Sequence, residues 1–201
     1  MGVSTGGIVL CGGKSRRMGQ PKATLPFGSE LMLQRVVRLV GQAVGPIVVV
    51  AAEGQQLPPL PKEVRIARDR HPDRGPLEGL TAGLRALPDD VDAAFVSACD
   101  LPLLKPHFIR RLLDLVPGFD VAVPHVGGFD EPLCAVYRKS VLPEIETLLA
   151  ENRRRPVFLF ERVRTRRVTA EELADMDPEL QSLQNTNTPE AYRAALERMR
   201  A

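Results

Sequence analysis

The segment GIVLCGGKSRRMGQPK, residues 7–22, contains a short apolar run that is followed at once by two adjacent glycines. Its first part, residues 7–10, has the composition of a buried β-strand. Glycines directly after a strand let the backbone turn tightly and bring its N–H groups close to a ligand. Arg16, Arg17 and Lys22 add positive charge to the same loop. Amide groups together with fixed cations suit a triphosphate, so we predict a phosphate-binding loop here.

Within this loop, residues 13–15 (GKS) look like the end of a P-loop, but the rest of that motif does not match. A P-loop has a glycine five residues before its second glycine, and that position is Ile8. A P-loop lysine also opens a long helix, whereas Gly19 and Pro21 interrupt the chain here. The sequence therefore argues against a P-loop ATPase.

Outward from this segment, short apolar strands alternate with stretches of helical spacing. We expect strands at 47–52, 64–67 and 93–98, and helices at 30–40, 77–87 and 105–115. This order is typical of a parallel sheet that is covered by helices on both faces. The second half is less regular, with strands expected at 121–124 and 133–137 and helices at 141–151, 156–162 and 188–199. No linker is visible, so a single domain over residues 1–201 is predicted.

Composition and charge exclude several classes of function. The formal net charge is only +2, whereas nucleic-acid binders usually carry a larger and more clustered excess. No segment approaches the roughly 20 apolar residues that cross a bilayer. Cys11, Cys99 and Cys134 are odd in number and far apart, which indicates buried free thiols in a reducing compartment. We therefore expect a cytoplasmic protein that binds neither nucleic acid nor membrane.

Asp100 is the strongest single candidate for a metal-binding residue. It follows the buried strand at 93–98, and Pro102 fixes the turn that comes next. Ligands of doubly wound sheets bind outside the carboxyl ends of the strands, where this carboxylate would stand. Mg²⁺ is usually held by one or two carboxylates together with substrate phosphates and water. Asp100 is therefore predicted to bind Mg²⁺, and the alternative is a solvated aspartate after a strand.

These motifs, in their order along the chain, resemble the nucleotidyltransferases that are built on a Rossmann-like sheet. The likeness is greatest to the molybdenum cofactor guanylyltransferase branch. The residues that carry it are Leu10-Cys11-Gly12-Gly13, Arg17-Met18-Gly19, Lys22, Asp69, Gly75-Pro76-Leu77-Glu78-Gly79, Cys99-Asp100-Leu101-Pro102 and Asn185-Thr186-Asn187-Thr188-Pro189. The resemblance implies a three-layer α/β/α fold with a mostly parallel central sheet, of the nucleotide-diphospho-sugar transferase type. Residues 1–115 would form the nucleotide-binding half and residues 116–201 the acceptor-binding half.

The resemblance also implies roles for individual residues. Lys22, Arg16 and Asp100 would be catalytic, and Asp100 would hold the metal. The nucleotide-binding residues would be Leu10, Cys11, Gly12, Gly13, Lys22, Asp69 and Asp100. The acceptor-binding residues would be Gly75, Gly79, Arg154, Asn185 and Asn187.

Several of these assignments have structural alternatives. Asp69 could be a surface residue beside a helix cap, and residues 153–155 (RRR) could form a solvated face. Thr188-Pro189 has the form of a helix cap, which accounts for half of the motif around the two asparagines. The segment at 129–137 is similar to a family strand beside the acceptor pocket, or it is an ordinary strand after a turn.

The reaction that the resemblance implies is transfer of GMP from GTP to the terminal phosphate of molybdenum-bound molybdopterin. Pyrophosphate would leave, molybdopterin guanine dinucleotide would form, and Mg²⁺ would be the cofactor. Molybdenum-insertion proteins and molybdoenzymes or their chaperones are implied as partners. Ala51 stands where the family has a nucleotide-contacting asparagine, so a cytidylyltransferase of the same cofactor stays open. Another nucleotidyltransferase of sugar-1-phosphate type and a non-catalytic nucleotide-binding adaptor also stay open.

Overall fold

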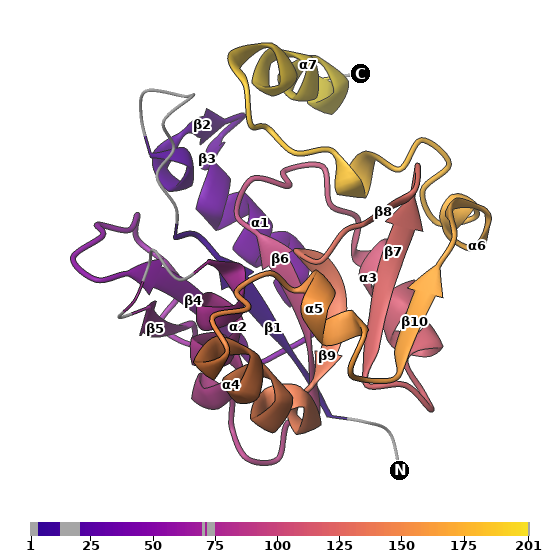
Figure 1. Cartoon of the computed structure of the whole chain (residues 1–201). Helices are drawn as coiled ribbons and strands as arrows, with labels where there is room; N and C mark the ends of the chain where they lie inside the picture. Colours follow the sequence, from indigo (N-terminus) through magenta and orange to yellow (C-terminus); the bar gives the residue numbers. More distant parts are fainter. Residues whose placement is uncertain (1–3, 13–20, 70, 72–74, 201) are drawn as a thin grey trace.

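The computed structural model describes residues 4–12, 21–69, 71 and 75–200, and its central feature is a sheet (Figure 1). The strand order is β10-β7-β9-β6-β1-β4-β5, and β8 pairs with β7 beside this path. The bounds of these strands are β1 (Thr5–Leu10), β4 (Ile47–Ala52), β5 (Arg65–Asp69), β6 (Ala93–Ala98), β7 (Val121–Val126), β8 (Phe129–Asp130), β9 (Cys134–Arg138) and β10 (Thr165–Val168).

Most neighbouring strands run parallel, which confirms the predicted α/β fold with a mostly parallel sheet. β1 pairs in parallel with β4 and β6, β4 with β5, and β7 with β10. β9 is the exception within the main path, because it runs antiparallel between β6 and β7. The amino end of β9 therefore lies at the same edge of the sheet as the carboxyl ends of β1 and β6.

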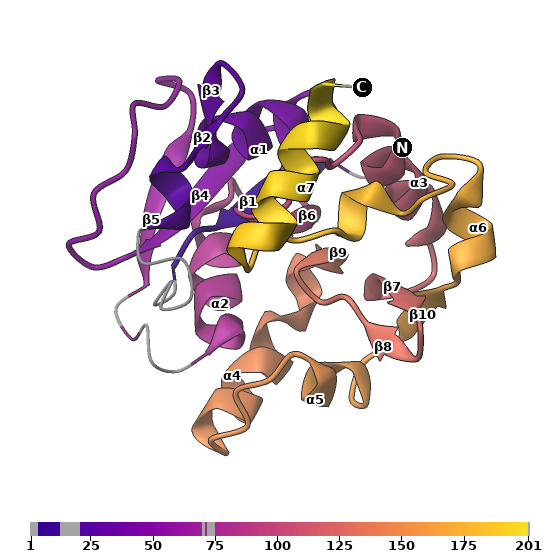
Figure 2. The same ribbon diagram turned by 90° about the horizontal axis from the view of Figure 1, so that it is seen from above.

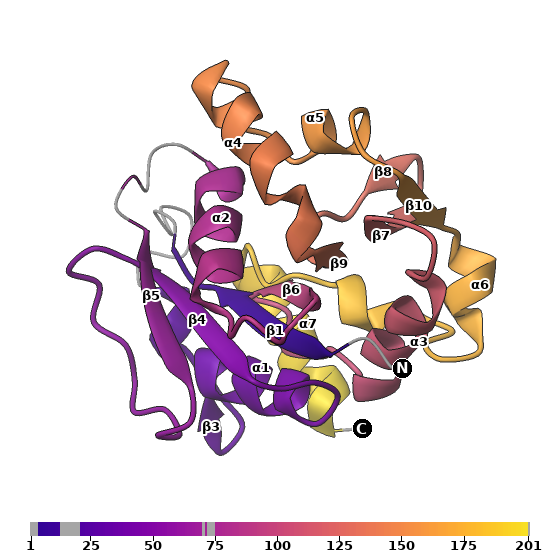
Figure 3. The same cartoon turned by 90° about the horizontal axis from the view of Figure 1, so that it is seen from below.

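Helices cover both faces of the sheet (Figure 3). They are α1 (Met32–Gly41), α2 (Pro76–Ala86), α3 (Pro106–Leu115), α4 (Leu142–Ala150), α5 (Val157–Phe160), α6 (Ala170–Ala174) and α7 (Pro189–Arg200). Successive residues of a strand point to opposite faces. Val9 accordingly belongs to the apolar cluster with α1 and α3, and Ile8 to the cluster with α2, α4 and α5. None of these helices is long and apolar enough to cross a membrane, within the residues that the structure describes.

The terminal helix α7 lies at the end of the molecule where β1 and β6 finish (Figure 2). It packs against a small hairpin of β2 (Pro26–Phe27) and β3 (Glu30–Leu31), which follows the first loop. The rings of Phe27 and Tyr192 meet edge to face at 6.2 Å between centroids, and the Tyr192 hydroxyl donates to the carbonyl of Pro26. The last helix is therefore fixed beside the hairpin of β2 and β3.

Several elements differ from the expectation from sequence. β10 and α6 were not predicted, and neither were the short strands β2, β3 and β8. The strand predicted at 64–67 is β5, which extends to Asp69 because that residue still pairs with Ala52 of β4. The helix predicted at 156–162 is α5, which ends at Phe160.

Gly83 sets how closely α2 approaches the sheet. A Cβ atom at this position would lie 2.6 Å from Ile8 Cγ2 and 3.2 Å from Val50 Cγ2. We expect Gly83→Val to lower the free energy of unfolding by about 1–3 kcal/mol, the usual cost of overpacking a core. Urea unfolding followed by circular dichroism measures this change.

Gly41 supplies the control, because a Cβ atom there would meet no atom within 4 Å. Gly41→Ala should leave the free energy of unfolding unchanged or raise it by up to about 1 kcal/mol through helix propensity. Equal stability of Gly83→Val and the unaltered protein would contradict this account of the packing.

Candidate active site

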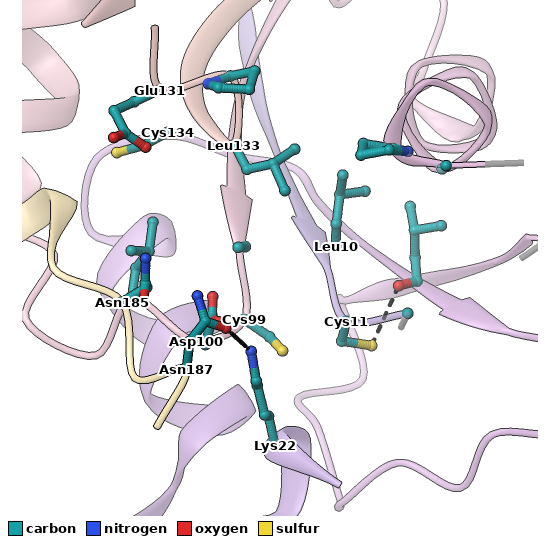
Figure 4. A pocket seen from close by; sticks show the side chains of 18 of the residues that line it. Leu10, Cys11, Lys22, Cys99, Asp100, Glu131, Leu133, Cys134, Asn185 and Asn187 are labelled. Carbon is teal, nitrogen blue, oxygen red and sulfur yellow. Dashed lines mark hydrogen bonds and ion pairs between the residues drawn. The ribbon is translucent and has the colours of Figure 1, made fainter. Parts of the chain in front are cut away.

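A cavity of about 500 Å³ opens at the edge of the sheet where β1, β5 and β6 end. Figure 4 shows part of it from close by. Its lining includes ten residues that the sequence singled out: Leu10, Cys11, Gly12, Lys22, Asp69, Gly75, Gly79, Asp100, Asn185 and Asn187. Ligands of open α/β sheets bind at this kind of edge. The predicted Gly13 and Arg16 lie outside the residues that the structure describes.

Lys22, Asp100 and Asn187 form one polar cluster in this cavity (Figure 4). The Nζ atom of Lys22 lies 2.6 Å from Oδ2 of Asp100, and it also donates to Oδ1 of Asn187. The three side chains come from the first loop, from the residues after β6 and from the segment before α7. The fold thus brings together a cation and a carboxylate that are 78 positions apart in the sequence.

The main chain of Asp100 is held independently of its side chain. The carbonyl of Asp100 accepts hydrogen bonds from the backbone N–H and the hydroxyl of Thr186, at 3.0 and 3.3 Å. Just before it, the N–H of Cys99 donates to the carbonyl of Leu10 at 3.0 Å. The side chain of Asp100 is 9% exposed and lines the cavity.

The segment 184–188, between the 3₁₀ turn Gln181–Leu183 and α7, is anchored through the buried carboxylate of Asp177. Oδ1 of Asp177 lies 2.7 Å from Nζ of Lys105, and Oδ2 accepts from the N–H of Ser182 at 2.7 Å. The hydroxyl of Ser182 in turn accepts from the N–H of Lys105 at 3.1 Å. These contacts fix the start of the segment that carries both asparagines.

The beginning of the first loop is braced by Gln55, which the sequence did not indicate. Its amide donates to the carbonyl of Cys11 and accepts from the N–H of Ala52, both at 3.0 Å. The thiol of Cys11 donates to the carbonyl of Val50 at 3.2 Å. Burial raises the pKa of this thiol to about 12, so it stays uncharged near neutral pH. The contacts of Cys11 therefore give it a structural role at the start of the loop.

Asp69 ends β5 and lines the cavity at 8% exposure. One of its oxygens accepts from the backbone N–H of His71 at 2.8 Å. Burial raises the pKa of the Asp69 carboxyl, and the nearby carboxylate of Glu78 adds to that effect. Carboxylate oxygens accept hydrogen bonds from hydroxyl and N–H groups, so Asp69 can recognise a sugar or a base.

The amino end of α2 also faces the cavity, and two glycines shape it. Gly75 has a φ of +80°, and a Cβ atom there would lie 3.1 Å from the carbonyl oxygen of Arg154. Gly79 lies against Leu10, since its Cβ would be 3.6 Å from Leu10 Cδ2. Pro76 occupies the first turn of the helix. A helix start offers N–H groups and partial positive charge to an anion.

Arg154 is not among the described residues that line the cavity. Its main chain packs behind Gly75 instead. Ala51 is fully buried within β4, in the cluster with α1 and α3. Ala51, which stands where the family has an asparagine, therefore faces the core. The preceding residue, Val50, lines the cavity.

The cavity also has lining residues that the sequence did not single out as site residues. Four of them, Glu131 to Cys134, belong to the turn between β8 and β9 and to the first residue of β9, and Leu183 precedes Asn185. The similarity at 129–137 was a signal for the turn. For Leu183 the sequence held no signal beyond its closeness to the asparagine motif.

Comparison with known proteins points to one family. The family model described as MobA-like NTP transferase domain matches residues 7–167. Two relatives, each described as a probable molybdenum cofactor guanylyltransferase, come from Mycobacterium ulcerans and Carboxydothermus hydrogenoformans. The relative from Mycobacterium ulcerans is 38% identical, and the alignment covers 92% of this chain and 90% of that protein. The relative from Carboxydothermus hydrogenoformans is 33% identical, and the alignment covers 94% of this chain and 93% of that protein. The crystal structure of molybdopterin-guanine dinucleotide biosynthesis protein A from Archaeoglobus fulgidus has a TM-score of 0.81 at 25% identity. The alignment covers 98% of this chain and 99% of that one.

Proposed function

Since the chain belongs to the MobA-like NTP transferase family, we propose that it transfers GMP from GTP to the terminal phosphate of molybdenum-bound molybdopterin. The chain is a nucleotidyltransferase, and its relatives carry the name of the guanylyltransferase of this cofactor. The observation that carries the proposal is the contact between Lys22 and Asp100 inside the cavity. Transfer of a group at a phosphorus atom needs a cation that neutralises phosphate charge and a carboxylate that can hold a metal ion. Lys22 and Asp100 supply both in one place.

The two sides of the cavity divide between the two substrates. Leu10 and Asp69 end β1 and β5, and Gly12 follows β1, whereas Glu131, Cys134 and Asn185 line the other side (Figure 4). In the strand order, β6 separates β9 from β1, β4 and β5, and Asp100 follows β6. In the proposal, GTP occupies the side of β1 to β5, the acceptor occupies the side of β9, and their phosphates meet at Asp100.

The proposed reaction is an in-line displacement at the α-phosphorus of GTP. An oxygen of the acceptor's terminal phosphate attacks, a new P–O bond forms, and the bond to the β-phosphate breaks so that pyrophosphate leaves. The attacking oxygen is already anionic, so no general base is needed. Positioning and charge neutralisation then account for catalysis. The Gly12 amide and Lys22 bind the triphosphate, and the predicted Gly13 and Arg16 would contribute from the same loop.

The residues of the cavity fit a magnesium ion. Mg²⁺ prefers hard oxygen ligands, and it is commonly bound by one or two carboxylates together with substrate phosphates. Asp100 supplies one such carboxylate inside the cavity, while the described residues contain no group of three or more His, Cys, Asp or Glu side chains that could hold a metal ion by themselves. Asp100 would therefore hold Mg²⁺ together with the triphosphate. When bound, the ion supplies charge neutralisation at the phosphates.

Asp69 supports GTP over CTP as the donor. Its carboxylate presents oxygens to the nucleotide side of the cavity. The Watson–Crick edge of guanine offers two adjacent N–H donors, and a carboxylate can accept from both. Cytosine offers one amino group beside two acceptors, and a carboxylate matches that edge less well.

A pyrophosphate-release assay tests the proposed function. It uses the purified protein, purified molybdenum cofactor, and GTP, CTP or ATP, each with and without Mg²⁺. We expect release with GTP that depends on both the acceptor and the metal. Preference for CTP would assign the cytidylyl reaction instead. No release with any triphosphate, despite stabilisation of the protein by GTP in a thermal unfolding assay, would favour the adaptor.

A further inference from the structure

Glu131 is a carboxylate on the acceptor side of the cavity to which the proposed transfer assigns no role. It lies in the turn between β8 and β9, on the same side as Cys134 and Asn185 (Figure 4). Leu133 stands between it and Leu10 of the nucleotide side in this view. A carboxylate here would face whatever part of the acceptor extends away from the reacting phosphate.

The position of Glu131 is fixed by its main chain. Its N–H donates to the carbonyl of Pro124 at 2.9 Å, and its carbonyl accepts from the N–H of Cys134 at 3.1 Å. The preceding Asp130 turns to other partners, because it contacts Arg167 at 3.1 Å and His125 at 2.7 Å. Glu131 thus lines the cavity from a turn that two backbone hydrogen bonds hold, and the charge of its neighbour Asp130 is paired with Arg167.

The carboxylate of Glu131 has no hydrogen-bond or ion-pair partner among the residues that the structure describes. It is half-buried in a cavity that Leu133 and Leu183 also line, and burial raises the pKa of the carboxyl. In the described part of the chain, Lys22 is the cation that lines the cavity, and it contacts Asp100 and Asn187. No fully buried side-chain oxygen of the described residues lacks a hydrogen-bond partner, so the unpaired oxygens of Glu131 are accessible. Because Glu131 lines the cavity, a ligand bound there can donate hydrogen bonds to these oxygens.

The chemistry of the acceptor indicates which of its groups could donate hydrogen bonds to Glu131. Its phosphate would be repelled by a carboxylate, so Glu131 faces another part of the molecule. A pterin ring carries a 2-amino group next to a ring N–H, and these two donors point the same way. Two carboxylate oxygens match such a pair, in the manner in which they match two N–H groups of a guanidinium.

We propose that Glu131 recognises the pterin ring of the acceptor through its 2-amino group and the adjacent ring N–H. This inference rests on the proposed function for the identity of the acceptor. Glu131 is then a specificity-determining residue, which excludes phosphorylated acceptors that lack this donor pair. Asp69 would recognise guanine on the other side, so each substrate would present the same kind of edge to its own carboxylate.

A binding experiment with two related ring systems tests the inference without the reaction. Pterin has the 2-amino group, whereas lumazine carries an oxygen in its place. Fluorescence titration of each compound into the protein measures both affinities. We expect the unaltered protein to prefer pterin, and Glu131→Gln to weaken pterin binding about 10- to 100-fold with little change for lumazine. Glu161→Gln, which changes an exposed glutamate, is the matched control.

Steady-state kinetics of the same variants give a second readout. In Glu131→Gln, the KM for molybdenum cofactor should rise by a similar factor, while the KM for GTP stays unchanged. A variant that keeps the preference for pterin, or an unaltered protein that binds pterin no better than lumazine, overturns the inference. Glu131-dependent pterin binding without any GMP transfer would support the inference and refute the proposed function, so the two failures are distinguishable.

Discussion

Replacing Asp100 with alanine is expected to lower kcat for GMP transfer by about 10³-fold or more, because the variant loses the carboxylate that is proposed to hold the metal. The fold should survive. The hydrogen bonds from Thr186 reach the main-chain carbonyl of Asp100, and its side chain contacts Lys22. Pyrophosphate release at saturating GTP and Mg²⁺ measures the activity, and thermal unfolding checks the fold.

Two further variants sharpen this test. Asp100→Asn keeps the shape of the side chain and removes the charge, so its loss of activity should be almost as large. Asp114→Ala removes an exposed aspartate of α3 and should retain the activity of the unaltered protein. Turnover near the original level in Asp100→Asn, at the same Mg²⁺ concentration, would rule out a metal-holding role for this carboxylate.

Replacing Lys22 with methionine is expected to lower kcat about 10²- to 10³-fold, the usual effect of removing one electrostatic contact to a transition state. Methionine keeps much of the length of the side chain and cannot neutralise a phosphate. The change also leaves Asp100 without its partner at 2.6 Å. Activity should therefore fall more than GTP binding, which a thermal unfolding assay with increasing GTP measures in parallel.

Lys22→Arg and Lys62→Met complete the set of lysine variants. Arginine keeps the charge and should restore part of kcat, although its planar group does not reproduce a compact ammonium. Lys62 is an exposed lysine in the loop before β5, so its replacement should leave kcat unchanged. An unchanged kcat in Lys22→Met would show that this cation takes no part in the transfer step.

The sequence predicted the buried strands well, because their side chains are apolar on both faces. β4 is the clearest case, because residues 47–52 are all β-branched or small. The strand lies between two layers of helices, and each of its faces packs in an apolar cluster. The apolar pattern carries no information on strand direction, however. The antiparallel course of β9 was therefore not predicted, although its position at 133–137 was.

β10 was missed for a different physical reason. Its sequence TRRV buries fully only Val168, and it lies at the edge of the sheet. Its arginines bond instead to side chains of other elements, Arg166 to Glu172 and Arg167 to Asp130. An edge strand stabilised by such pairs has no hydrophobic periodicity that a reading of the sequence can detect.

The sequence predicted which residues form the candidate site, but it did not predict the contacts between them. Lys22 and Asp100 were expected to share a cleft, and the structure places them in contact. The bond from Lys22 to Asn187 and the anchoring of Asp100 by Thr186 depend on how the last segment crosses the sheet edge. Gln55 was overlooked because it belongs to no motif. Glu131 lies in the segment whose similarity to a family strand pointed to the turn, but that similarity gave no role to this side chain.

The segment 184–188 also bears on how the protein is made. A ribosome delivers the chain from the amino end, so the loop after β1 and the carboxylate after β6 emerge long before the stretch that holds Thr186 and Asn187. Until that stretch arrives, the carbonyl of Asp100 and the ammonium of Lys22 have no partner from it. Nascent or prematurely terminated chains would then have an unfinished cavity, with one wall missing. Competence for nucleotidyl transfer would therefore depend on the arrival of this stretch.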